Sequence, residues 1–144
     1  MKIIFVVAAR PNFIKMAPLF SKVKNNSKVE TVIVHTGQHY DNNMSDVFFR
    51  QLSIPEPEYN LGIGSCSHSE QTARIMISFE KVLDKEKPDL VIVFGDVNST
   101  LACSLVCSKS GVKLAHVEAG LRSYNWNMPE EINRVLTDRM SDYL

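Results

Sequence analysis

Hydrophobic and polar positions alternate in blocks along this chain. Short, unbroken apolar runs rich in β-branched residues recur four times, at Lys2–Ala8, Glu30–His35, Asp89–Phe94 and Lys113–Val117. Runs of this kind are typical of strands buried on both faces, as in a parallel sheet. We therefore predict four parallel strands.

Between and after these runs, apolar positions follow the helical period. The predicted helices are Pro11 to about Asn25, Met44–Leu52, His68–Lys87, Asn98–Ser110 and Pro129–Tyr143. Pro11 suits a first helical turn, and Gly111 follows the fourth helix as a cap. This alternation of strands and helices predicts an α/β fold, a doubly wound Rossmann-like parallel sheet with right-handed crossovers.

Length and composition indicate one soluble globular domain of 144 residues, with 44% hydrophobic and 22% charged residues. Sixteen acidic and sixteen basic residues cancel and are scattered, so we expect no nucleic-acid partner. No apolar run approaches the roughly 18 residues of a membrane span, and we expect no membrane partner. Because the chain stops where another strand is expected to begin, we expect half of a larger protein.

The cysteines and histidines do not predict a metal site. Cys66, Cys103 and Cys107 lack the spacing of metal ligands, and His35, His39 and His68 also lack it. We expect the three cysteines to be buried structural thiols of a protein in the reducing cytoplasm.

The first strand-to-helix turn carries candidate phosphate-binding groups. Arg10 lies in this turn and Lys15 lies about one helical turn further on. A helix N-terminus with free N–H groups and nearby cations suits phosphate. The turn has no glycine-rich fingerprint, so neither a dinucleotide site nor a P-loop is predicted. Taken alone, Arg10 is equally consistent with a surface residue.

A second candidate follows the third predicted strand. Gly95 permits close backbone approach, and Asp96 stands at the carboxyl end of the strand. A catalytic role for Asp96 competes with an ordinary structural one, because Asp96 or Asn98 would also cap the next helix.

The fourth strand leads into a third candidate. His116 and Glu118 are two residues apart and are expected to share a face, and Gly120 and Arg122 follow. Burying such a pair is costly without partners or a purpose. Trp126, in the next loop, is consistent with covering either a ligand or the core.

The last predicted helix begins with Glu130 and Glu131, which complement the helix dipole. Glu130 and Arg134 have the spacing of an ordinary surface ion pair. Together with Asp96 and Arg10, however, these groups gather at predicted strand ends, where open α/β sheets form their active sites. The sequence therefore predicts an enzyme that acts on an anionic substrate.

Five ordered blocks carry a resemblance that covers essentially the whole chain. They are Arg10-Pro11 with Ile14-Lys15-Met16-Ala17-Pro18, Gly37-Gln38-His39, Gly95-Asp96, His116-Val-Glu-Ala-Gly-Leu-Arg122 and Pro129-Glu-Glu-Ile-Asn-Arg134. In these blocks the chain resembles the amino-terminal half of the non-hydrolysing UDP-N-acetylglucosamine 2-epimerases.

This resemblance implies a two-domain fold of the glycosyltransferase-B type, with a UDP-sugar held between the domains. Residues 1–144 would form the amino-terminal Rossmann-like domain, and the carboxy-terminal domain is absent from this chain. The implied enzyme is a cytoplasmic, homodimeric isomerase. It converts UDP-GlcNAc to UDP-ManNAc for cell-surface polysaccharide synthesis, by loss and re-addition of UDP, without NAD or a metal cofactor.

The resemblance also implies residue roles. Its catalytic carboxylates correspond to Asp96, Glu118 and Glu130, without indicating which is acid, base or hydroxyl anchor. The implied substrate-binding residues are Arg10, Lys15, His116, Arg122 and Arg134. Gln38 and His39 match part of a bacterial allosteric site, whose expected arginine after Leu61 is absent, so allosteric activation is not predicted.

Other interpretations stay open. Parts of the sequence also resemble epimerases of UDP-2,3-diacetamido-2,3-dideoxy-glucuronate, which differ in the C3 and C6 groups of the substrate. A hydrolysing epimerase that releases free ManNAc is a further alternative, as is a catalytically inactive UDP-sugar-binding fragment. Asn12 departs from the acidic residue of many family members, and the segment between Glu118 and Glu130 is shorter than in well-studied bacterial enzymes.

Overall fold

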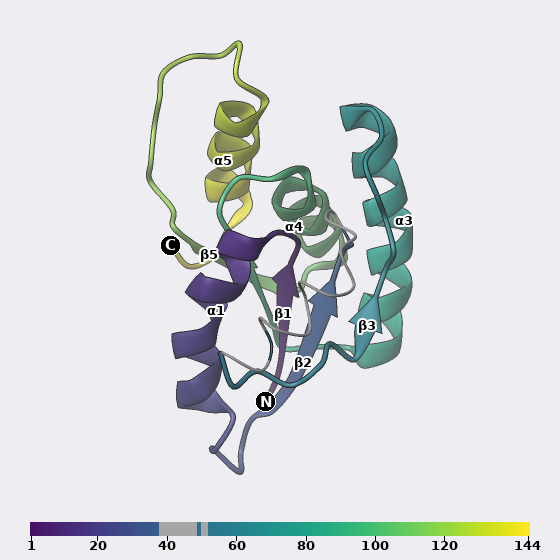
Figure 1. Cartoon of the computed structure of the whole chain (residues 1–144), viewed down its shortest axis with the longest axis vertical. Helices are drawn as coiled ribbons and strands as arrows, with labels where there is room; N and C mark the ends of the chain where they lie inside the picture. Colours follow the sequence, from purple (N-terminus) through teal and green to yellow (C-terminus); the bar gives the residue numbers. More distant parts are fainter. Residues whose placement is uncertain (38–48, 50–51) are drawn as a thin grey trace.

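The computed structural model describes residues 1–37, 49 and 52–144, and within them the strands form a five-stranded, all-parallel sheet (Figure 1). The strands are β1 (Lys2–Val7), β2 (Glu30–His35), β3 (Tyr59–Asn60), β4 (Leu90–Phe94) and β5 (Lys113–Val117). Their order across the sheet is β3-β2-β1-β4-β5. The predicted parallel sheet is confirmed.

The described helices are α1 (Arg10–Val23), α3 (His68–Glu86), α4 (Asn98–Ser110) and α5 (Pro129–Met140). The chain first builds the sheet from β1 through β2 to β3, then returns to add β4 and β5 on the other side of β1. The connections therefore diverge between β1 and β4. At such a switch point, an open parallel sheet leaves a crevice beyond its carboxyl ends.

Each face of the sheet has its own hydrophobic core. On β1, Ile4 and Val6 pack in the cluster that contains the buried side chains of α3 and α4. Ile3, Phe5 and Val7 alternate with them and pack in the cluster that contains those of α1. This is the period of two expected of a strand buried on both sides, and it confirms the doubly wound prediction.

The cysteines differ in their environments. Cys103 and Cys107 are fully buried in α4, as predicted, and burial raises the pKa of Cys107 to about 12. Cys66 is exposed, so its predicted burial is wrong. It lies in the loop before α3, where its side chain is exposed and does not belong to either hydrophobic core.

Three elements differ from the sequence prediction. Helix α5 ends at Met140 rather than Tyr143, because Tyr143 forms a parallel bridge with Ala115 at the edge of β5. Strand β3 was not predicted, since two residues are too short for a hydrophobic pattern. The predicted helix Met44–Leu52 lies largely outside the described residues.

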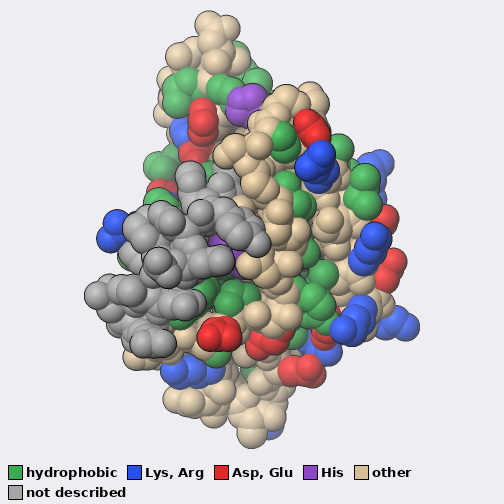
Figure 2. All heavy atoms as spheres, turned by 45° about the vertical axis from the view of Figure 1, so that its right-hand side comes forward, with side chains coloured by type: hydrophobic (Ala, Val, Ile, Leu, Met, Phe, Trp, Pro, Cys, Tyr) green, Lys and Arg blue, Asp and Glu red, His purple; other side chains and the backbone are tan. Residues whose placement is uncertain are grey.

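Charges of both signs lie interspersed on the side of the molecule that carries β3 and α3 (Figure 2). Neither sign dominates this face, in agreement with the balanced composition. Across residues 1–37, 49 and 52–144, the helices are too short or too polar to cross a bilayer.

Gly37, just after β2, lies where two backbone segments approach each other closely at the carboxyl edge of the sheet. Its φ is +89°, and a Cβ there would lie 2.8 Å from the backbone nitrogen of Ile63. Gly37→Ala is expected to lower the free energy of unfolding by about 2 kcal/mol, through strain and backbone displacement. Urea unfolding measures the loss. Gly64→Ala is the control, because its Cβ would meet open space, and equal effects of both variants would contradict the prediction.

Candidate active site

The switch-point crevice is organised around Gly95, which follows β4. Gly95 has a φ of +68°, and a Cβ on it would lie 3.4 Å from Oε2 of Glu118. The same position is 3.5 Å from Nδ2 of Asn12 and 3.7 Å from Nζ of Lys15. Polar groups from α1 and from the end of β5 therefore meet over this glycine. A larger residue would crowd them.

Glu118 and Lys15 form an ion pair at this point. Their side chains remain about a third exposed, at 36% and 32% respectively. Glu118 lies just after the end of β5 at Val117 and has a φ of +75°, outside the extended conformation of a strand. The alternation expected for His116 and Glu118 thus stops at the end of the strand, and the two side chains contact different partners.

Asn12 joins the ends of β1 and β4. Its Oδ1 accepts hydrogen bonds from the N–H groups of Ala8 and Ala9, at 3.1 and 3.0 Å. Its Nδ2 donates to the carbonyl of Phe94 at 3.1 Å. An ionised carboxylate has no proton to donate to that carbonyl. The sequence marked Asn12 only as a departure, because its partner on β4 lies 82 residues away.

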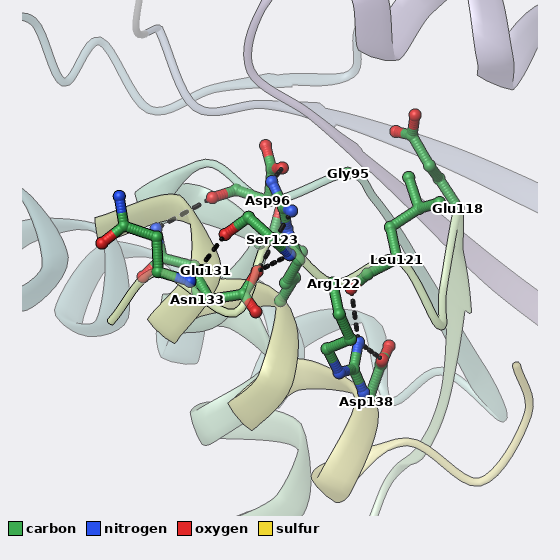
Figure 3. A network of polar contacts seen from close by, with 12 residues as sticks. Gly95, Asp96, Glu118, Leu121, Arg122, Ser123, Glu131, Asn133 and Asp138 are labelled. Carbon is green, nitrogen blue, oxygen red and sulfur yellow. Dashed lines mark hydrogen bonds and ion pairs between the residues drawn. The ribbon is translucent and has the colours of Figure 1, made fainter. Parts of the chain in front are cut away.

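Asp96 pairs with a cation from α5. Its Oδ2 accepts a hydrogen bond from Nη2 of Arg134 at 2.5 Å, and Nδ2 of Asn133 donates to its backbone carbonyl at 2.9 Å. Figure 3 shows the contact between Asn133 and Asp96. The N-cap of α4 is Val97, which makes no side-chain cap, so neither Asp96 nor Asn98 caps this helix. The capping alternative is therefore wrong.

The two neighbouring glutamates of α5 have different environments. Glu131 is 1% exposed and accepts hydrogen bonds from the N–H groups of Ser123 and Tyr124, each at 2.9 Å. These bonds, above all the one from Ser123, lower the pKa of Glu131 despite its burial. Glu130 is exposed. Arg134 pairs with Glu131 and Asp96 rather than forming the expected surface pair with Glu130.

His116, expected to bind substrate, is buried, and both of its ring nitrogens contact protein atoms. Nδ1 lies 2.6 Å from Oδ1 of Asp138, and Nε2 lies 2.7 Å from the carbonyl oxygen of Gly95. Arg122, also expected to bind substrate, pairs with the other oxygen of Asp138 at 2.6 Å. Asp138 was not a predicted site residue. Its only signal in the sequence is the helical spacing of four residues from Arg134.

The remaining predicted residues lie around this core of contacts. Arg10 is exposed at the start of α1, at the carboxyl end of β1. Trp126 is 63% exposed in the loop between β5 and α5, so it does not cover the core. Gln38 and His39, which match part of a bacterial allosteric site, lie outside the described residues.

A separate cavity of about 480 Å³ lies between α3, α4 and α5. It is lined by residues that include His68, Asn98 and Asn133, and none of the predicted catalytic carboxylates lines it. In the part of the chain that the structure describes, no three His, Cys, Asp or Glu side chains are grouped to hold a metal ion.

The geometry defines a class of site. Two partly exposed carboxylates follow adjacent parallel strands, each beside a cation, at the switch point of an open α/β sheet. Such a site suits the binding of an anionic ligand and proton transfer to and from it. Residues 21–144 match the family model of UDP-N-acetylglucosamine 2-epimerase. The chain belongs to this family.

Similar proteins support this assignment. A UDP-N-acetylglucosamine 2-epimerase homolog of Methanococcus maripaludis is 56% identical over 144 residues, which are all of this chain and 40% of that protein. The UDP-2,3-diacetamido-2,3-dideoxy-D-glucuronate 2-epimerase of Pseudomonas aeruginosa is 51% identical over all of this chain and 41% of its own length.

Solved structures agree with the fold. The UDP-GlcNAc 2-epimerase of Methanocaldococcus jannaschii, in complex with UDP-GlcNAc and UDP, superposes with a TM-score of 0.96 and 52% identity. The match covers all of this chain and 40% of that one. A Streptomyces glycosyltransferase, with a TM-score of 0.54 and 14% identity, shares the fold alone. The chain therefore has the Rossmann-like architecture of one half of a glycosyltransferase-B fold, and it spans about 40% of the length of these epimerases.

The buried Glu131 predicts a pH-dependent stability. Because its pKa in the folded state is lowered from 4.5, its ionised form stabilises the fold fully above that value. The contribution is lost as the pH falls through the lowered pKa. Glu131→Gln should therefore unfold at a lower urea concentration than the wild type near neutral pH, and the difference should shrink in acid. Glu130→Gln is the exposed control, and an equal loss there would contradict a specific role of Glu131.

Proposed function

We propose that the protein to which this chain belongs converts UDP-GlcNAc to UDP-ManNAc by elimination and re-addition of UDP. One observation carries the proposal: Asp96 and Glu118, from adjacent strand ends, flank Gly95 at the open edge of the sheet, each beside a cation. Membership of the epimerase family supports it. So does the 52% identity to an epimerase crystallised with UDP-GlcNAc and UDP.

The chemistry explains why such groups are needed. The proton on C2 of the sugar is not acidic, because no carbonyl lies beside it to stabilise a carbanion. A base removes it only as the bond from C1 to the UDP oxygen breaks, which forms a C1–C2 double bond. Returning a proton to the opposite face of C2, while UDP adds again to C1, inverts C2 and restores the substrate framework. The sequence of steps is redox-neutral, so it requires no electron acceptor.

In this proposal the carboxylates exchange the proton and the cations stabilise the leaving UDP. Asp96 and Glu118 supply acid–base groups from two separate strand ends, as transfer at two faces of one carbon requires. Lys15 and Arg10 lie on the first turns of α1, whose N-terminus offers further positive potential to phosphate. Glu130 lies in the first turn of α5 and is a third candidate carboxylate.

A second candidate is 2-epimerisation of UDP-2,3-diacetamido-2,3-dideoxy-glucuronate. It is favoured by the 51% identity to the Pseudomonas aeruginosa enzyme of that name. The same proton transfer at C2 would serve both substrates, since they differ in the groups on C3 and C6. These groups would be recognised by residues that the chemistry at C2 does not require.

In the proposed enzyme, residues 1–144 would form one domain and therefore one wall of the substrate cleft. A cleft has two walls, and a carboxy-terminal domain would supply the second wall and further contacts to the nucleotide. We propose that residues 1–144 alone do not turn over substrate. The cytoplasmic location and the homodimer that the resemblance implies stay predictions.

The first test uses the full-length protein with UDP-GlcNAc in D2O, followed by proton NMR. UDP-ManNAc with deuterium at C2 is the expected product, because the transferred proton exchanges with solvent. Free ManNAc would contradict the proposal in favour of a hydrolysing epimerase. No reaction with UDP-GlcNAc, but reaction with the diacetamido-uronate, would establish the second candidate instead.

The catalytic carboxylates are tested by isosteric substitution in the full-length protein. Asp96→Asn and Glu118→Gln should each lower kcat by about a hundredfold or more, the lower range for positioned acid–base groups. Glu70→Gln is the matched control, since Glu70 is half-exposed on α3 and pairs with Arg74 on the same helix. Near-normal turnover of both site variants would refute their assignment.

A further inference from the structure

We propose that Asp138 is a positioning residue that holds the two catalytic strand ends in register, a role that rests on the proposed epimerase function. Asp138 lies on α5 and its side chain is only 7% exposed. It does not reach the open edge of the site, but it is linked to the segments that carry both Asp96 and Glu118. Figure 3 shows its position below the loop that follows Glu118.

Three donors from two segments meet on this carboxylate. Nδ1 of His116, on β5, lies 2.6 Å from Oδ1. The N–H of Gly120 donates to Oδ2 at 3.0 Å, and Nη1 of Arg122 lies 2.6 Å from the same oxygen. A buried carboxylate is stable only when it is so fully compensated. Both oxygens of Asp138 are therefore already in contact with donor groups of the protein.

The carboxylate acts on Gly95 through His116. The carbonyl oxygen of Gly95 can only accept a hydrogen bond, and it lies 2.7 Å from Nε2 of His116. Nδ1, on the other side of the ring, lies 2.6 Å from Oδ1 of Asp138. The buried ring therefore bridges the carboxylate and the Gly95 carbonyl, and through that carbonyl it holds the turn that leads to Asp96.

The same carboxylate acts on Glu118 through the loop. Gly120 lies two residues after Glu118, and its N–H is fixed by Asp138. Glu118 itself has a φ of +75°, a conformation that a non-glycine residue keeps only where its surroundings hold it. Arg122 neutralises charge on Asp138 from the far end of this loop. Burial opposes ionisation of Asp138, but Arg122, Gly120 and His116 outweigh it and lower its pKa.

The variant that tests this role is Asp138→Asn in the full-length protein. The amide keeps the shape, but it loses the charge and turns an NH2 group toward donors. We expect kcat to fall by about ten- to a hundredfold through misplacement of the catalytic groups. KM should stay within about threefold of the wild-type value, because Asp138 contacts neither the phosphate-binding turn nor the open edge.

Asp142→Asn is the matched control. Asp142 lies just after α5 and, like Asp138, bonds β5, but it bonds Lys113 and the N–H of Leu114 at the start of that strand, away from the site. It should leave kcat and KM unchanged. An equal fall in kcat in the two variants, or none in Asp138→Asn, would overturn the proposal.

One NMR measurement separates this proposal from the proposed function. The Gly120 amide, which donates to Asp138, should exchange at least about tenfold faster in Asp138→Asn than in Asp142→Asn, and equal rates would overturn the proposal. If the wild type fails to epimerise UDP-GlcNAc while this difference holds, the substrate assignment fails and the positioning role of Asp138 stands.

Discussion

The close approach of three strand ends around Gly95 is the constraint on which the site depends. Parallel strands bring their carboxyl ends to one edge, and the change of direction between β1 and β4 opens a crevice there. Gly95 leaves space for Glu118 and Lys15 to meet across it. Asn12 holds β1 against β4 by bonding backbone groups of both. The polar crevice is thus a consequence of backbone geometry.

The acidic residues of this edge divide into two kinds by environment. Glu131 and Asp138 are buried, and backbone N–H groups and arginines bind their oxygens. The oxygens of these two carboxylates already accept hydrogen bonds from the loop between β5 and α5, so the carboxylates hold that loop in place. Asp96 and Glu118 are about one third exposed, and within the described residues each pairs with one cation. They keep lone pairs available for a ligand, which is what acid–base chemistry on a bound sugar requires.

Helix α5 connects these two kinds of carboxylate. One helix supplies Glu131 and Asp138 to the loop and Arg134 to Asp96. Because the residues are spaced by three and four, they face the same side of the helix. A displacement of α5 would therefore move the loop and the partner of Asp96 together. The proposed chemistry then depends on the packing of a helix that contributes only one candidate catalytic residue, Glu130.

The sequence by itself determined four of the five described strands, the described helices that follow them and the edge where the polar residues gather. Apolar runs and capping signals such as Gly111 involve residues that are close in the sequence, so they can be recognised without knowledge of tertiary contacts. The family blocks added candidate roles for Asp96 and Glu118. Only the tertiary structure decided which charges pair, because Asn12 and Phe94, Lys15 and Glu118, and Asp96 and Arg134 are 82, 103 and 38 residues apart. It also separated buried Glu131 from exposed Glu130, since two adjacent glutamates look alike until a loop folds over one of them.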